Sequence, residues 1–122
     1  MKKRILIADD EPNIVVSLEF LMQQCGYDIR TATNGDDALK AIHEFRPHLV
    51  LLDVMMPMKN GYEVCQTVRA SPALKEVKIV MLTAKGRELE VAKGLAIGAD
   101  AYVTKPFATK ELLATVKGLL ET

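Results

Sequence analysis

The chain has 122 residues and a mass of 13.5 kDa, which is the size of one domain. Hydrophobic residues make up 49% and charged residues 26%, so the composition excludes an intrinsically disordered chain. Sixteen basic residues balance sixteen acidic ones, which argues against binding of nucleic acid or anionic lipid through bulk charge. No apolar run approaches the roughly 20 residues of a membrane span, and no signal peptide is indicated. We therefore expect a cytoplasmic location and no contact with a membrane.

Short apolar runs rich in branched side chains alternate with segments of helical periodicity. Proline near the first turn and glycine after the last turn mark several helix ends. In chain order, the expected elements are strand Ile5–Ala8, helix Pro12–Cys25, strand Asp28–Ala32, helix Ala38–Phe45, strand Leu49–Leu52, helix Tyr62–Ala70, strand Ile79–Leu82, helix Glu88–Ile97, strand Ala101–Thr104 and helix Leu112–Leu120.

The alternation of strands and helices indicates the fold class. Strands that are each followed by a helix predict a parallel sheet covered on both faces. The run Leu49–Leu52 is apolar without alternation, as expected for a central strand that is buried on both faces. No linker or low-complexity segment divides the chain. We predict a single doubly wound α/β domain over residues 1–122.

Distinctive side chains follow four of the expected strands. In open parallel sheets, ligands bind beyond the carboxyl ends of the strands. Close carboxylates repel one another, and a hard divalent cation such as Mg²⁺ compensates them. A hydroxyl and an ammonium group beside them suit an incoming phosphoryl group. The residues are Asp9, Asp10 and Glu11 after the first strand, Asp53 after the third, Thr83 after the fourth and Lys105 after the fifth.

Together with Met56-Pro57 and Asn60-Gly61 after Asp53, and Pro106-Phe107 after Lys105, these residues resemble the receiver domain of two-component response regulators. The resemblance covers the whole chain and extends to chemotaxis regulators. It implies a flavodoxin-like, five-stranded parallel sheet in the order 2-1-3-4-5 with five helices. It also implies a cis peptide bond between Lys105 and Pro106.

The same resemblance implies the roles of the residues at the strand ends. Asp53 is the expected phosphoacceptor. Mg²⁺, for which Mn²⁺ can substitute, is expected to bind Asp10, Asp53 and the backbone carbonyl of Met55 directly. Asp9 is expected to contribute through a metal-bound water, and Lys105 is expected to bind the phosphoryl group.

Three further residues are implied to regulate the phosphorylated state. Thr83 contacts the phosphoryl group and acts with Tyr102 as a switch. Met55 and Lys85 flank the path of the attacking water. Because neither can act as a general base at neutral pH, we predict slow self-dephosphorylation.

The function implied is a signalling switch and not an enzyme, one that promotes only its own phosphotransfer and autodephosphorylation. Its phosphodonor would be a phosphohistidine of a sensor histidine kinase or a histidine phosphotransfer protein. Phosphorylation would change the face formed by the fourth helix, fifth strand and fifth helix, roughly residues 88–120. That face would control an output domain or a target protein. The resemblance also allows a second copy of this chain as the partner, in a homodimer that forms on phosphorylation.

Two other functions would each need residue features that differ from those of this sequence. A phosphatase or mutase with an aspartyl phosphate would usually need a second acid shortly after its nucleophile, whereas Val54, Met55 and Met56 follow Asp53. A phosphorylation-independent interaction module would usually lack the acceptor aspartate or the lysine, and both are present. The two histidines, His43 and His48, are expected to be surface residues without a role in phosphotransfer.

Overall fold

The computed structural model describes residues 2–84 and 98–121. Five parallel strands form one sheet in the order β2-β1-β3-β4-β5, which confirms the predicted fold class and strand order. Each predicted strand is present, with ends that differ by at most two residues from the prediction. The strands are β1 (Arg4–Ala8), β2 (Asp28–Ala32), β3 (Leu49–Asp53), β4 (Lys78–Ala84) and β5 (Ala101–Lys105).

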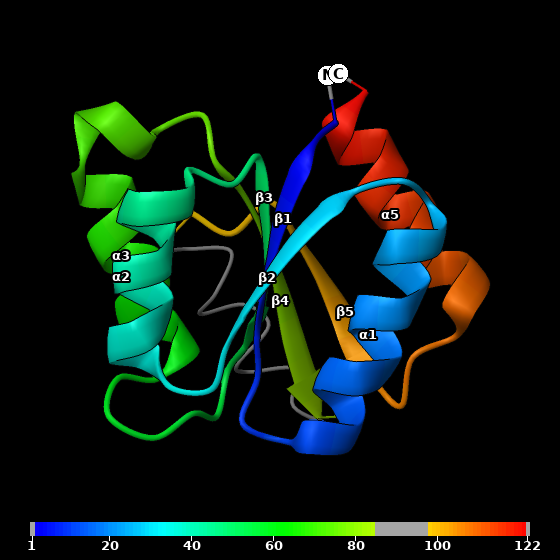
Figure 1. Cartoon of the computed structure of the whole chain (residues 1–122). Helices are drawn as coiled ribbons and strands as arrows, with labels where there is room; N and C mark the ends of the chain where they lie inside the picture. The colour runs from blue at the N-terminus through cyan, green and yellow to red at the C-terminus, as the bar shows by residue number, and fades with distance from the viewer. Residues whose placement is uncertain (1, 85–97, 122) are drawn as a thin grey trace.

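Helices cover both faces of this sheet. In Figure 1, α2 and α3 lie on one side of the strands, and α1 and α5 lie on the other. The fourth predicted helix, Glu88–Ile97, lies outside the described residues. The helices in the described part are α1 (Pro12–Gln24), α2 (Gly35–Phe45), α3 (Gly61–Ala70) and α5 (Thr109–Leu120), with a short 3₁₀ turn η1 (Pro72–Leu74).

Side-chain caps explain why α2 and α3 begin earlier than the apolar periodicity predicts. The side-chain oxygen of Asn34 accepts a hydrogen bond from the backbone N–H of Asp37, at 2.8 Å. Asn60 accepts one from the N–H of Glu63 at 3.0 Å, and Glu63 accepts one in return from the N–H of Asn60 at 3.1 Å. Such caps satisfy backbone donors that the first turn of a helix leaves unpaired.

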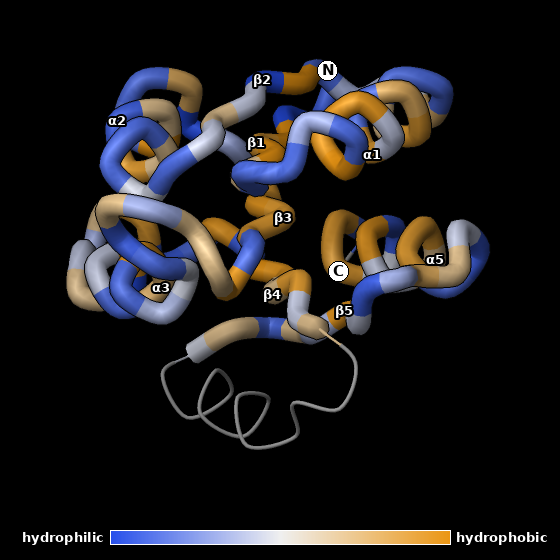
Figure 2. The backbone as a smooth tube through the Cα atoms, turned by 90° about the horizontal axis from the view of Figure 1, so that it is seen from below, coloured by the Kyte–Doolittle hydropathy of each residue, from blue (hydrophilic) through white to orange (hydrophobic). Residues whose placement is uncertain are grey.

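Two apolar layers lie on the two faces of the sheet. One contains Leu6, Val50, Leu52 and Met81 and is covered by α2 and α3. The other contains Leu49 and is covered by α1 and α5. All five residues of β3 are buried, as predicted for a central strand. Figure 2 shows the hydrophobic strands at the centre, with helices whose hydrophilic residues face outwards.

Among residues 2–84 and 98–121, no helix combines the length and the apolar character needed to cross a bilayer.

Candidate functional site

The register of the sheet brings the predicted site residues together at its carboxyl edge. Ala8, the last residue of β1, lies opposite Leu52 of β3. Asp9 therefore leaves β1 beside Asp53, the last residue of β3. On the other side of β3, Asp53 lies opposite Leu82 of β4, one residue before Thr83. The central strands thus place acidic residues and a hydroxyl at one edge, onto which Figure 2 looks.

Three carboxylates converge at this edge. Asp9, Asp10 and Asp53 each offer one oxygen, and these oxygens lie within 4.8 Å of one another. The Asp9 and Asp53 side chains are buried, whereas Asp10 is exposed. Asp9 Oδ1 accepts a hydrogen bond from the backbone N–H of Glu11 at 2.9 Å. The other oxygen, Oδ2, is buried and lies 2.8 Å from the ammonium nitrogen of Lys105. A donor set of three carboxylates, all offering oxygen, fits a hard divalent cation such as Mg²⁺.

The ammonium group of Lys105 lies among carboxylates. Its Nζ is 2.8 Å from Asp9 Oδ2, 3.3 Å from Asp53 Oδ1 and 3.3 Å from Glu11 Oε1. Burial alone would lower the pKa of Lys105, but its hydrogen bond with Asp9 and the charge of Asp53 outweigh burial and raise the pKa. Lys105 therefore remains a fixed positive charge beside Asp53.

Asp53 itself is held in an environment that disfavours its charged form. Burial, together with repulsion from Asp9, raises the pKa of Asp53 to about 7. The charge of Lys105 and a 3.2 Å hydrogen bond from the backbone N–H of Met55 act in the opposite direction. A divalent cation at the three carboxylates would lower this pKa and keep Asp53 ionised, which is the form that can act as a nucleophile.

Thr83 and Tyr102 share one face of the sheet. Tyr102 of β5 lies opposite Met81 of β4, and Thr83 is two residues after Met81. Because side chains alternate along a strand, Thr83, Met81 and Tyr102 project to the same side. Tyr102 packs against the apolar layer that contains Met81. The Thr83 hydroxyl is buried and has no hydrogen-bond partner within residues 2–84 and 98–121.

A cavity of about 280 Å³ opens beside Asp53. Met55 lies at its rim with a side chain that is 59% exposed. The prediction that the Met55 carbonyl binds a metal remains a prediction, and Lys85 lies outside the described residues. The lining residues are Asp10, Glu11, Asp53, Val54, Met55, Leu82, Ala84 and Lys105.

Two contacts were not anticipated from the residue pattern. The sequence places Glu11 among three acidic residues after the first strand and assigns it no partner. In the structure its carboxylate pairs with Lys105. The sequence feature that could have indicated this contact is the position of Glu11 directly after Asp9-Asp10. His48 was expected to be a surface residue, whereas it is half-buried and its Nδ1 accepts a hydrogen bond from the backbone N–H of Arg4 at 2.9 Å. No local pattern indicates that contact, because 44 residues separate the two partners in sequence.

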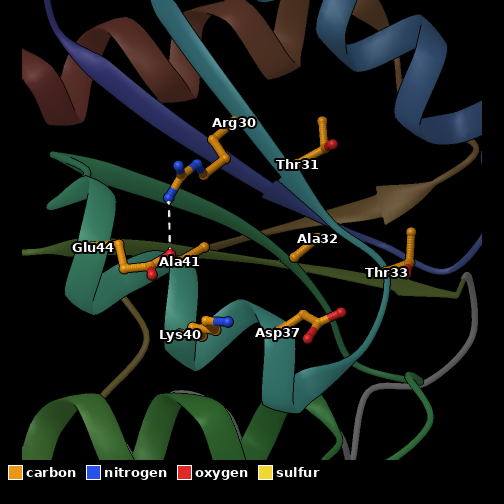
Figure 3. A pocket seen from close by; sticks show the side chains of 8 residues that line it. All are labelled: Arg30, Thr31, Ala32, Thr33, Asp37, Lys40, Ala41 and Glu44. Carbon is orange, nitrogen blue, oxygen red and sulfur yellow. Dashed lines mark hydrogen bonds and ion pairs between the residues drawn. The ribbon is translucent and has the colours of Figure 1, made fainter.

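A second hollow lies between β2 and α2, away from the three carboxylates. Figure 3 shows Arg30 on β2 reaching Glu44 on α2, with an Nη1–Oε1 distance of 3.4 Å. Asp37 and Lys40 also line this hollow. Asp37 is engaged at the start of α2, where its N–H and its carboxylate both bind the Asn34 side chain. We therefore assign the functional site to the cavity beside Asp53.

The Lys105–Pro106 peptide bond is cis, as the resemblance implied. A family model for the response regulator receiver domain matches residues 5–117.

Similar solved structures cover essentially the whole chain. A candidate response regulator from Chloroflexus aurantiacus J-10-fl is 35% identical, with full coverage of both chains and a TM-score of 0.96. The BeF3-activated receiver domain of DrrB is 38% identical, with full coverage of both chains and a TM-score of 0.90. The chemotaxis response regulator CheY4 of Vibrio cholerae is 30% identical over 98% of this chain and 99% of that one, with a TM-score of 0.91. The family model matches most of the chain, the strand order is the one that the resemblance implied, and the chain belongs to the response regulator receiver domain family.

Proposed function

We propose that residues 1–122 form one receiver domain in which Asp53 accepts a phosphoryl group in a Mg²⁺-dependent reaction. Members of this family are phosphorylation-activated switches that take phosphoryl groups from histidine kinases and regulate outputs. The observation that carries the assignment to Asp53 is its place at the end of the central strand. There its Oδ1 lies 3.3 Å from Lys105 Nζ, and its carboxylate lies beside those of Asp9 and Asp10.

The proposed donor is a phosphohistidine of a sensor histidine kinase or a histidine phosphotransfer protein. An oxygen of Asp53 attacks the phosphorus, the phosphorus–nitrogen bond breaks, and the imidazole leaves with the electron pair of that bond. Asp9, Asp10 and Asp53 would hold Mg²⁺, with the Met55 carbonyl as the fourth protein group. When bound, Mg²⁺ supplies compensation for the negative charge of the carboxylates and of the incoming phosphoryl group. Lys105 is placed to contact a phosphoryl oxygen as a point charge.

Thr83 is the proposed link between the phosphoryl group and the rest of the domain. Its buried hydroxyl, which has no hydrogen-bond partner within the described residues, can donate to a phosphoryl oxygen and gain a charge-assisted hydrogen bond. Movement of Thr83 would leave space on the face of the sheet that Tyr102 shares. A change of the Tyr102 rotamer would fill that space and alter the face formed by residues 88–120.

We further propose that this chain acts in the cytoplasm as a signalling protein and is not an enzyme in the ordinary sense. Cys25 and Cys65 are not joined in a disulfide bond, which is compatible with a reducing compartment. The proposed partners are the phosphodonor protein and either an output domain or a target protein, with a phosphorylation-dependent homodimer as an alternative. Direct binding of nucleic acid or a membrane by this domain is not part of the proposal.

Acetyl phosphate labelling tests the assignment of the acceptor. With Mg²⁺, the wild-type protein should gain one phosphate that is stable in acid and labile in base. Asp53→Asn removes the nucleophilic carboxylate, so it should gain none, whereas Asp37→Asn on α2 should label like the wild type. Removal of Mg²⁺ with a chelator should abolish labelling, because the acidic residues would then repel the donor. Equal labelling of Asp53→Asn and wild type, by intact-protein mass spectrometry, would show that the assignment is wrong.

A further inference from the structure

The methionines of the described residues fall into two classes of exposure. Met22 and Met81 are fully buried, and Met56 is 8% exposed. Met55 is 59% exposed and Met58 is 73% exposed. Three of these side chains come from one short loop after β3, so neighbouring thioethers differ in their access to dissolved oxidants. Among the methionines of residues 2–84 and 98–121, Met55 and Met58 are the two that are open to attack without unfolding.

Met55 also lies closer to the proposed phosphorylation site than Met58 does. The backbone N–H of Met55 donates to Asp53 Oδ1 at 3.2 Å. Met55 and Asp53 both line the cavity of about 280 Å³, whereas Met58 is not among the described residues that line it. A chemical change at the Met55 sulfur would therefore alter the surroundings of Asp53, while the same change at Met58 would not.

We propose that Met55 is an oxidation site at which a peroxide shortens the lifetime of the phosphoryl group on Asp53. In this step the Met55 sulfur attacks one oxygen of hydrogen peroxide and the O–O bond breaks. Sulfur loses two electrons and becomes a sulfoxide, and the peroxide is reduced to one molecule of water. Methionine sulfoxide reductases reverse this oxidation.

The sulfoxide would affect hydrolysis because it changes the rim of the cavity from apolar to polar. A thioether is a weak hydrogen-bond acceptor, so the Met55 side chain offers little to hold a water molecule beside Asp53. A sulfoxide oxygen is a strong acceptor and can retain a water in the cavity near the phosphorus. The effect on lifetime rests on the proposed phosphorylation of Asp53, whereas the oxidation itself does not.

Hydrogen peroxide treatment followed by peptide mapping tests the modification site. Wild type, Met55→Leu and Met58→Leu would be treated with peroxide and analysed by tandem mass spectrometry. Met55 and Met58 should become sulfoxides, while Met22, Met56 and Met81 remain reduced. Met55 that stays reduced while Met58 is oxidised would overturn the proposal.

The lifetime is then measured on the same samples after labelling with acetyl phosphate and removal of the donor. Oxidised wild type should lose phosphate about two- to tenfold faster than untreated protein, the factor expected for one net hydrogen bond to the attacking water. Oxidised Met58→Leu should show the same acceleration, and Met55→Leu should show none. Met55→Leu retains both cysteines, so an acceleration that persists in it would come from a thiol or another site and would contradict the proposal, as would an unchanged rate in oxidised wild type.

The two measurements separate this proposal from the proposed function. If untreated protein gains no phosphate on Asp53, the proposed function fails and the effect on lifetime fails with it. The peptide map still decides in that case whether Met55 is the oxidation site.

Discussion

His48 lies at the amino end of β3, at the edge of the sheet opposite to Asp53, and its ring accepts a hydrogen bond. Nδ1 accepts from the backbone N–H of Arg4, so the bond requires that nitrogen to be unprotonated. Burial lowers the pKa of His48, and the positive charges of Arg4 and Lys3 lower it further. Glu76 and Lys78 line the same hollow as His48.

The lowered pKa predicts how stability depends on pH. The unfolded chain binds a proton at His48 near the ordinary pKa of 6.5, whereas the folded protein binds it only at lower pH. The stabilisation from His48 is therefore complete above that value and is lost as the pH falls below it. His48 should therefore lower Tm as the pH decreases from about 7 to about 5, the range in which a histidine charges. The raised pKa of Asp53 acts in the opposite direction over this range, so the contribution of His48 is measured as the difference in Tm between wild type and a His48 variant.

Two asparagine variants test this dependence. His48→Asn places an acceptor oxygen near the position of Nδ1 and removes the titration, so the Tm of wild type should fall relative to that of His48→Asn as the pH decreases over this range. His43→Asn removes a histidine from the exposed surface of α2 and should retain the wild-type pH profile. Identical pH profiles for wild type and His48→Asn would show that this hydrogen bond does not contribute.

Met55 and Lys85 govern the predicted lifetime of the phosphorylated state. Met55 lines the cavity beside Asp53 with an apolar side chain, and Lys85, which lies outside the described residues, is a cation at neutral pH. Neither supplies a general base for water. Met55→Asn combined with Lys85→Glu introduces polar groups that can bind and activate water, so phosphate loss should accelerate at least about tenfold. Release of phosphate after removal of acetyl phosphate measures this rate, and an unchanged or slower rate would contradict the prediction.

Arg69 connects three secondary-structure elements. From α3 its Nε donates to the carbonyl of Gly98 and its Nη1 to the carbonyl of Val77, both at 2.7 Å. Its Nη2 lies 2.6 Å from Asp100 Oδ2, which also accepts from the backbone N–H of Ile79 at 2.7 Å. One guanidinium group therefore joins the end of α3 to the start of β4 and to the turn before β5.

Removal of this group should destabilise the domain. Arg69→Ala would remove the guanidinium donor from two carbonyls and from the Asp100 carboxylate, and we expect a loss of about 2 kcal/mol in the free energy of unfolding. Arg30→Ala is the control, because Arg30 makes an exposed ion pair with Glu44 at 3.4 Å and lies over the Phe45 ring, 5.5 Å from its centroid, and an exposed contact of the second kind contributes about 0.5–1 kcal/mol. Exposed ion pairs contribute about 0–1 kcal/mol. Urea denaturation measures both values, and equal losses for the two variants would mean that the connection made by Arg69 is not stabilising.

At the scale of the whole molecule, the proposed switch couples Asp53 to a distant face through Thr83 and Tyr102. These two side chains lie on the same side of adjacent strands, β4 and β5. Phosphorylation adds close to two negative charges and three acceptor oxygens next to Thr83. If both arrangements already exist in the free protein, the phosphoryl group shifts their populations without changing the fold.

Beryllofluoride, which mimics an acyl phosphate, tests this coupling without turnover. In NMR spectra, backbone amide shifts should be largest around Thr83–Ala84, Tyr102 and the face formed by residues 88–120. Thr83→Ala removes the hydroxyl and should reduce the shift at Tyr102, whereas Thr31→Ala on the edge strand β2 should leave it unchanged. Large shifts confined to α1 and α2, with Tyr102 unaffected, would show that this coupling route is wrong.

Local sequence patterns were sufficient to predict the strands and helices of the described residues and to indicate which side chains lie at the carboxyl edge of the sheet. Apolar periodicity reports which residues face the core, and caps such as Asn60 with Glu63 act within one turn of helix. In a parallel sheet, the residues after each strand share one edge, so the convergence of Asp9, Asp53 and Lys105 followed from the strand positions and the strand order that the resemblance implied. These features depend on residues near one another in the chain or on a regular topology.

Other properties depended on contacts between residues far apart in sequence. Glu11 and Lys105 are 94 residues apart, and Arg69 and Asp100 are 31 apart. Met56 is buried while the adjacent Met55 is exposed, although the two residues are chemically identical. Periodicity does not distinguish such neighbours in a loop, because burial there is set by the helices and strands that pack around it. The elements and their chemistry could therefore be predicted locally, whereas side-chain partners and solvent access required the packed tertiary structure.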